Sequence, residues 1–376
     1  MYEHLNLREW PFRVVPDPAF ATVWAGRRQT HEQILRLVRK IQFAPVSALH
    51  LLWANFGMGK THTLLHMRHL CQQTQGRLIP IYAVMAQRPN GFLDLYRAIV
   101  SAFPHDLLAD QLVEMGRTWA GSLQSHPLFS KSPGLVSALL AVRGSDPAVA
   151  ATARQWLIGQ PGLSARDLRS VGVTYRIKTA EDSINALSAL TALAVLPSAR
   201  STKLVLMIDE YERIGLLKPR IRDEINGGVH TYFNANPTGL ELILSFSFGR
   251  QDNVSYLLSS ELKSRAEPSS ISLDVLTKQE AIDFLRDLLA QFRVREDARW
   301  AYPFSPEALE AIVEHVADRK SLTPRRLMVY TNHALLESQA AREPASATEI
   351  GVDEVREYLA DPRLGEIDTD QRGLGT

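Results

Sequence analysis

The sequence predicts an α/β fold: a parallel sheet sandwiched by helices, with a long helical insertion and a C-terminal helical lid. Short apolar segments alternate with helical patterns, which is typical of a parallel sheet covered on both faces. A glycine-rich loop joins the first apolar segment to a helix, and a later apolar segment ends in two adjacent carboxylates. From residue 277 onward the pattern is helical.

The predicted strands are short segments dominated by leucine, isoleucine and valine, with polar or glycine-containing stretches between them. They comprise residues 48–54, 78–85, 203–208, 240–248 and 271–275. Helical patterns precede or separate the first strands at residues 27–43, 61–73 and 90–103.

The second and third predicted strands are separated by residues 104–200, far more than a normal crossover needs. Helical patterns fill this stretch, so we expect an inserted subdomain or a surface for a partner protein. The predicted division of the chain is an N-terminal arm (1–25), a sheet domain (26–276) that carries the insertion, a helical lid (277–361) and a disordered tail (362–376).

The composition excludes several classes of protein. The 376 residues carry a formal net charge of +1, so no overall basic field points to nucleic acid, although a local basic face stays possible. The single cysteine, Cys71, cannot form an internal disulfide. No apolar run reaches the ~18 residues that span a bilayer, and the first residues lack the apolar core of a signal peptide. We therefore expect a cytoplasmic protein without a membrane segment.

The glycine-rich loop has the residues that cradle a nucleoside triphosphate. Residues 54–61 (the P-loop) read A-N-F-G-M-G-K-T, close to the pattern G-x-x-x-x-G-K-[ST], with alanine in place of the first glycine. Gly57 and Gly59 let backbone N–H groups turn toward phosphate oxygens. Lys60 supplies positive charge, Thr61 offers a hydroxyl to Mg²⁺, and the following helix adds its positive end. The expected nucleotide contacts are Asn55, Phe56, Gly57, Met58, Gly59, Lys60, Thr61 and His62.

Two carboxylates complete the expected site. The segment L-V-L-M-I-D-E, residues 204–210, ends in Asp209 and Glu210. Asp209 would hold Mg²⁺ near Thr61, and Glu210 would polarise the attacking water. An acidic pair after a core strand is often only a solvated strand end, but together with the P-loop it favours hydrolysis of ATP over binding alone.

These motifs, in this order, resemble AAA+ ATPases, in the branch that contains origin-recognition initiators, transposition regulators and STAND-type signalling ATPases. The resemblance covers roughly residues 22–360. Within it, W-A-G-R-R at 24–28 resembles the family segment that abuts the adenine. The resemblance implies an ATPase that uses Mg²⁺, works as a homo-oligomer and changes the conformation of partners.

Further site positions follow from the same resemblance. E-L-K-S-R at 261–265 resembles the helix end whose arginine reaches a neighbouring subunit's γ-phosphate, which makes Arg265 the expected arginine finger. S-L-T-P-R-R-L at 321–327 resembles the start of the lid helix that carries the sensor-2 arginine, expected as Arg325. Ser247 is the expected sensor-1 residue. The alternatives are Arg250 or Lys263 for the finger and Arg326 for sensor 2.

Two narrower resemblances point to different processes. Residues 154–160 (R-Q-W-L-I-G-Q) and 165–173 (A-R-D-L-R-S-V-G-V) resemble ATP-binding proteins of BREX-type antiphage systems, which implies bacterial defence acting on DNA or partner effectors. Residues 2–18 resemble the start of ExeA-type ATPases, which implies a transposition or secretion regulator. A nucleotide-gated scaffold with little turnover is a further alternative.

Other polar residues are expected to have structural or surface roles. Histidines follow the P-loop at helical spacing, but a metal site needs further ligands: His62, His66 and His69. A short basic cluster beyond Glu210 is expected to be a solvated helix face, with contact to DNA phosphates as the alternative: Lys218, Arg220 and Arg222.

Overall fold

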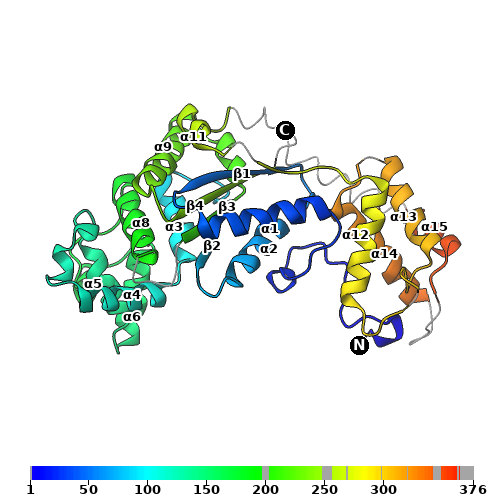
Figure 1. Ribbon diagram of the computed structural model, residues 1–376, viewed down its shortest axis with the longest axis horizontal. Helices are drawn as coiled ribbons and strands as arrows, with labels where there is room; N and C mark the ends of the chain where they lie inside the picture. Colours follow the sequence, from blue (N-terminus) through cyan, green and yellow to red (C-terminus); the bar gives the residue numbers. More distant parts are fainter. Residues whose placement is uncertain are drawn as a thin grey trace. The chain divides into compact units, whose positions relative to one another are not determined.

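The computed structural model describes residues 2–196, 203–247, 256–267, 270–297, 299–319, 321–341, 349–361 and 364. It confirms the predicted α/β fold, with a five-stranded parallel sheet flanked by helices (Figure 1). The chain divides into two compact units. One contains residues 1–32, 55–66 and 273–376, and the other contains residues 33–54 and 67–272. The boundaries of arm, insertion, lid and tail drawn from the sequence stay predictions.

The sheet has the strand order β2–β3–β4–β1–β5. Every residue of β1, β3 and β4 is buried, which explains why these strands read as continuous apolar runs. Because the strands are parallel, their carboxyl ends share one edge of the sheet. The strands are β1 (Ala48–Ala54), β2 (Leu78–Val84), β3 (Lys203–Asp209), β4 (Leu240–Phe246) and β5 (Ile271–Leu273). All five predicted strands are present, and Phe248 of the predicted fourth strand lies outside the described residues.

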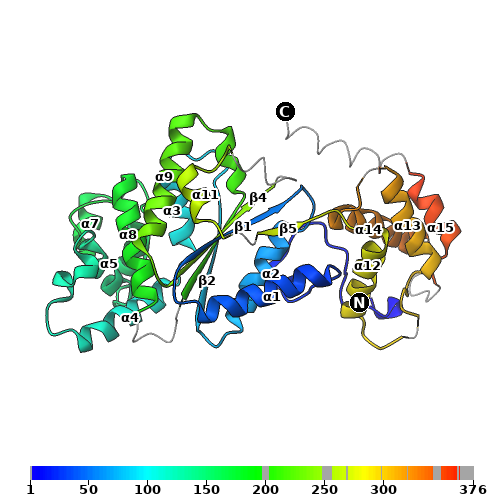
Figure 2. The same ribbon diagram turned by 45° about the horizontal axis from the view of Figure 1, so that its top comes forward.

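Helices lie on both faces of the sheet (Figure 2). On one face, α3 (Phe92–Ser101), α8 (Ala180–Ala194) and α9 (Pro219–Ala235) share a hydrophobic core with the strands. On the opposite face lie residues 33–43 of α1 (Arg28–Phe43) and residues 67–72 of α2 (Lys60–Gln72). A short helix, α11 (Ser260–Arg265), precedes β5.

The chain between α3 and α8 forms further helices, α4 (His105–Thr118), α5 (Gly134–Val142), α6 (Pro147–Leu157) and α7 (Ala165–Val171). They extend the core of the sheet rather than forming a separate one, since Leu112, Leu139 and Trp156 belong to the same hydrophobic cluster as the strands. A capping box of Ser164 and Asp167 begins α7.

The other unit contains the helices α12 (Lys278–Phe292), α13 (Pro306–Arg319), α14 (Pro324–Ala341) and α15 (Val352–Leu359). A capping box formed by Thr277 and Glu280 begins α12. Over the ranges that the structure describes, no helix is both long enough and apolar enough to cross a membrane.

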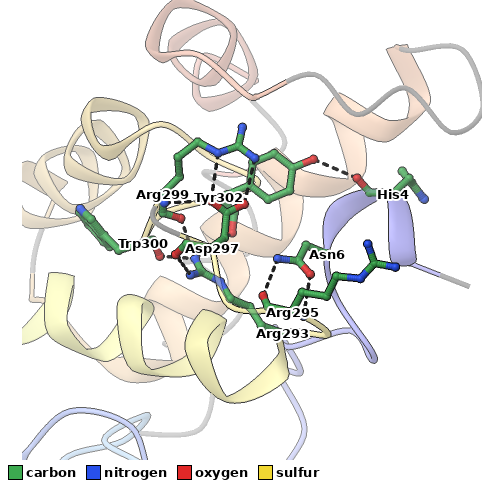
Figure 3. A network of polar contacts seen from close by, with 8 residues as sticks. All are labelled: His4, Asn6, Arg293, Arg295, Asp297, Arg299, Trp300 and Tyr302. Atoms are coloured by element: carbon green, nitrogen blue, oxygen red, sulfur yellow. Dashed lines mark hydrogen bonds and ion pairs between the residues drawn. The ribbon is translucent and has the colours of Figure 1, made fainter.

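The N-terminal segment is part of the core of these helices. Leu5, Leu7 and Phe12 are buried in the same cluster as the side chains of α12 to α15. Figure 3 shows how the segment is held: the Asn6 side chain donates to the carbonyl of Arg295, 2.9 Å away, and accepts from its N–H, 3.0 Å away. The segment is therefore anchored both by apolar burial and by paired hydrogen bonds.

Candidate nucleotide-binding site

The P-loop connects β1 to α2. The strand ends at Ala54 and the helix begins at Lys60. Gly57 and Gly59 have φ angles of 79° and 88°, where any other residue would be strained. The N–H of Thr63 donates to the carbonyl of Gly59 over 2.8 Å and closes the first helical turn. The segment thus has the strand–loop–helix form that phosphate binding requires.

Two arginines lie against the backbone of the P-loop. The Nη1 of Arg27 donates to the carbonyl of Met58, 2.8 Å away. The backbone N–H of Arg325 donates to the carbonyl of Gly57, 3.2 Å away, and its guanidinium lies 5.0 Å from the centroid of the Phe56 ring. The first turn of α14 therefore contacts the P-loop directly.

The two adjacent arginines of α14 have different partners. The Nη1 of Arg326 donates to the carbonyl and the hydroxyl of Ser321, 3.1 and 2.9 Å away, within the same unit. Arg325 instead lies on the P-loop. This difference favours Arg325 over Arg326 as the arginine that would contact the nucleotide, and its role stays a prediction.

The histidines after the P-loop anchor the segment that precedes α1. The ring of His62 donates to the carbonyl of Val23 over 2.8 Å, and burial lowers the pKa of His62, which keeps the ring neutral. The ring of His66 is hydrogen-bonded to the carbonyl of Ala21, 2.7 Å away. In the described part of the chain, no group of three or more histidine, cysteine or acidic side chains is placed to hold a metal. The ring of His62 is thus engaged with the segment that precedes α1.

Asp209 ends β3 and is held in place by three hydrogen bonds. The hydroxyl of Ser245 donates to Oδ1 over 2.5 Å, the hydroxyl of Tyr82 donates to Oδ2 over 3.0 Å, and the N–H of Glu210 donates to Oδ1 over 2.8 Å. The side chain is buried. Donors from the two flanking strands therefore fix the orientation of this carboxylate, as outer partners do around metal ligands.

Glu210 follows Asp209 in the left-handed region, with φ of 58°. This conformation turns the chain from β3 into the 3₁₀ helix η5 (Tyr211–Leu216). The Glu210 carboxylate forms an ion pair with Arg213, whose guanidinium also donates to the carbonyl of Met85. About a third of the Glu210 side chain (34%) is exposed, while Oε2, the oxygen that faces Arg213, is buried.

The other predicted positions are spread over the unit that holds the sheet. Arg265 and Lys263 are exposed on α11, with Arg265 at its C-terminal end. Ser247 lies just after β4 and is half-buried. Sequence reasoning selected Ser247, whereas the serine that contacts Asp209 is Ser245. Arg250 lies outside the described residues.

The donor atoms present fit Mg²⁺. Asp209 offers carboxylate oxygens, the donor that Mg²⁺ prefers, and two hydroxyls hold it in one orientation. Mg²⁺ in nucleotide sites takes one or two protein oxygens and fills its remaining positions with phosphate oxygens and water. A single well-oriented carboxylate is therefore a suitable contribution of this unit.

No protein-family model matches the sequence, and a search of curated proteins finds no match. Solved structures do match. The ORC2 protein of Aeropyrum pernix, in ADPNP–ADP complexes, has a TM-score of 0.54 at 13% identity, over 90% of this chain and 70% of that one. The ORC1 protein of the same organism, in complex with DNA, has a TM-score of 0.50 at 14% identity, over 94% and 70%.

A Walker-type ATPase of Pyrococcus abyssi has a TM-score of 0.50 at 12% identity, over 97% of this chain and 79% of that one. Identities this low show similarity of fold alone. The chain therefore shares the fold of these proteins, in agreement with the α/β fold predicted from its sequence.

Proposed function

We propose that this protein is an ATPase that binds ATP with Mg²⁺ and hydrolyses it. One observation carries the proposal: a P-loop whose carbonyls are held by Arg27 and Arg325 occurs in the same chain as an oriented carboxylate, Asp209, followed by a partly exposed one, Glu210. These are the parts that phosphoryl transfer to water needs.

Each residue has one role in this proposal. Backbone N–H groups of the P-loop and the Lys60 ammonium bind the phosphates. Thr61 and Asp209 are the protein's ligands for Mg²⁺, which would neutralise phosphate charge when bound. Glu210 accepts the proton of the attacking water, and Arg325 binds a phosphate from the first turn of α14.

Assembly into a homo-oligomer would complete the site. Arg265 is exposed at the end of α11, and this exposure supports its assignment as the arginine offered to a neighbouring copy of the chain. An arginine supplied by a neighbour stabilises the charge of the transition state, so turnover would rise with assembly. The hydrolysis cycle would then drive a conformational change in partner proteins or DNA.

Replacing Lys60 with alanine should weaken ATP binding by about 10- to 100-fold, because hydrogen bonds to charged groups contribute about 1.5–3 kcal/mol. Titration of the purified full chain with ATP, by calorimetry, measures the change. Lys40→Ala is the matched control, since Lys40 is an exposed lysine of α1. ATP affinity that is unchanged in the Lys60 variant would remove the P-loop assignment.

The role in the cell is proposed from the two narrower resemblances. The segments at 154–160 and 165–173 support antiphage defence through their resemblance to BREX-type proteins. The opening residues support transposition or secretion instead. Identifying the genes next to the one that encodes this protein would distinguish between these processes. Turnover that stays near zero in every assembly condition would leave the nucleotide-gated scaffold as the function.

We further propose that the N-terminal end of α9, with its N-cap Lys218, contacts DNA phosphates. Lys218 occupies the N-cap of α9 without capping it, and no acidic residue lies in the first turn. Lys218 and Arg220 are exposed, and Leu216 beside them is 87% exposed. The amino-terminal end of a helix carries partial positive charge, so cationic side chains there are unfavourable unless an anion binds beside them. This arrangement favours the phosphate-binding alternative over a merely solvated helix face.

A Lys218→Ala/Arg220→Ala variant should bind duplex DNA more weakly and with a flatter salt dependence. Two lost phosphate contacts lower the slope of log K against log[salt] by about 2. Anisotropy of a fluorescein-labelled duplex, measured at several salt concentrations, gives the slope. Arg166→Ala/Arg169→Ala removes two exposed charges from α7 as a control. Equal slopes for the wild type and the Lys218/Arg220 variant would contradict the assignment.

A further inference from the structure

Arg27 is a buried cation that joins three segments of one compact unit. Its guanidinium donates through Nη1 to the carbonyl of Met58 in the P-loop, 2.8 Å away, and through Nη2 to the carbonyl of Asp274, 2.6 Å away. Asp274 lies between the last residue of β5 and the first of α12, so it belongs to the connector that leads into the lid helices. Only 9% of Arg27 is exposed.

The chain places Arg27 there at a conformational cost. Arg27 has φ of 44°, and Gly26 before it has φ of 60°. A residue other than glycine keeps a left-handed backbone conformation only where the contacts around it hold it there. At Gly26 a Cβ would lie 3.2 Å from the Cβ of Phe284, and its N–H donates to the Asp287 carboxylate over 3.0 Å. The turn before α1 is thus fixed on α12, and it directs Arg27 to the P-loop.

Arg27 keeps its charge in this position. Burial lowers the pKa of Arg27 to about 10, against the opposing effect of Glu280 and Asp274, so the group is protonated at neutral pH. A buried guanidinium is costly unless its donors are used. Here the two short bonds reach backbone carbonyls, so what Arg27 fixes is the orientation of two peptide groups.

The bond to Met58 decides where the next N–H points. In a trans peptide the C=O and the following N–H point to opposite sides. Holding the Met58 carbonyl toward Arg27 therefore directs the Gly59 N–H away from Arg27. The N–H of Met58, which belongs to the preceding peptide, closes a turn on the carbonyl of Asn55, 3.3 Å away, so the Gly59 N–H rather than the Met58 N–H is the one that can be offered to an anion.

We propose that Arg27 is a positioning residue for phosphate binding: it holds the Met58–Gly59 peptide so that the Gly59 N–H faces the phosphates, and through Asp274 it links that peptide to the connector of the lid helices. The inference rests on the proposed ATP site and adds two statements to it. Phosphate binding needs a residue that does not touch the nucleotide. Nucleotide bound at the P-loop also orders the connector through Arg27.

Arg27→Met tests both statements, because methionine keeps an unbranched apolar stem and removes the donors. ATP affinity should fall about 10-fold or more, as expected for a lost charged hydrogen bond that orients a ligand group. In the wild type, ATP should slow amide hydrogen exchange in the connector, residues 274–277, and in the variant this protection should be lost. Arg28→Met is the matched control, since Arg28 is the exposed neighbour.

Arg27→Lys provides a second variant in case methionine unfolds the unit. Lysine keeps the charge but lacks the fork that reaches two carbonyls, so ATP affinity should lie between the wild type and the methionine variant. ATP affinity of either folded variant within twofold of wild type, or connector protection that persists in Arg27→Met, overturns the inference. If Lys60→Ala also binds ATP like the wild type, the proposed site itself fails, so the two failures can be told apart.

Discussion

Glu210→Gln should lower the kcat of ATP hydrolysis by about 10²–10⁴-fold, the usual contribution of a positioned general base. Glutamine keeps the shape of the side chain but cannot accept the proton of the attacking water. ATP affinity should stay close to that of the wild type, because the groups that bind phosphate belong to the P-loop. Phosphate release, measured over a series of protein concentrations with and without DNA, gives kcat in each state of assembly.

Glu212→Gln is the control for this change, since Glu212 is a second carboxylate of η5 two residues further on. The fold around Glu210 should survive its substitution, because Arg213 keeps its hydrogen bond to the carbonyl of Met85. If the wild type and Glu210→Gln both show negligible turnover under every condition, the proposed ATPase activity is contradicted. The result would then support a nucleotide-gated scaffold. Equal but substantial turnover places the general base elsewhere.

The P-loop and the acidic pair could be predicted because their residues are contiguous in the sequence. The partners of Asp209 could not, since Tyr82 and Ser245 reach it through the alignment of three strands that are far apart along the chain. The only available signal was a hydroxyl near the carboxyl end of each neighbouring strand.

Arg27 shows the same limit. The resemblance placed the segment 24–28 near the adenine, but nothing in the sequence distinguishes a buried Arg27 from its exposed neighbour Arg28. The left-handed turn at Gly26 and Arg27 makes the difference, and it depends on packing against α12. Tertiary contacts of this kind are not encoded in any local pattern.

The length of helix α9 has little local signal, because two adjacent glycines, Gly227 and Gly228, interrupt its pattern beyond the expected helix face at residues 218–222. Glycine costs about 1 kcal/mol relative to alanine inside a helix. At Gly228 it is required, since a Cβ there would lie 2.3 Å from the ring of Phe92 on α3. Packing of α9 against the sheet core therefore outweighs its low intrinsic propensity.

A group of ionisable side chains is buried in the sheet, near the amino-terminal ends of its strands. The Glu241 carboxylate accepts from the Lys203 ammonium over 2.5 Å and from the His50 ring, 2.9 Å away. The three side chains come from the neighbouring strands β3, β4 and β1, and each is at most 3% exposed. A carboxylate shared by two buried partners makes the stability of the sheet depend on all three residues being present together.

Glu241→Leu should therefore lower the free energy of unfolding by about 3–5 kcal/mol, because it leaves Lys203 buried without its counter-charge. Removing the whole group, as His50→Leu/Lys203→Met/Glu241→Leu, should restore stability or exceed the wild type by about 1–4 kcal/mol, since no buried charge is then left unpaired. Urea unfolding followed by circular dichroism measures both.

The exposed pair formed by Lys40 and Glu267 supplies the control for this comparison. Glu267→Leu should change the free energy of unfolding by at most about 1 kcal/mol, because solvent screens the attraction. If the free energy of unfolding of Glu241→Leu is no lower than that of Glu267→Leu, the buried charges do not depend on one another for stability. A triple variant as unstable as Glu241→Leu would assign the loss to packing of the leucine rather than to the unpaired ammonium, because the triple variant keeps the leucine and removes the charge.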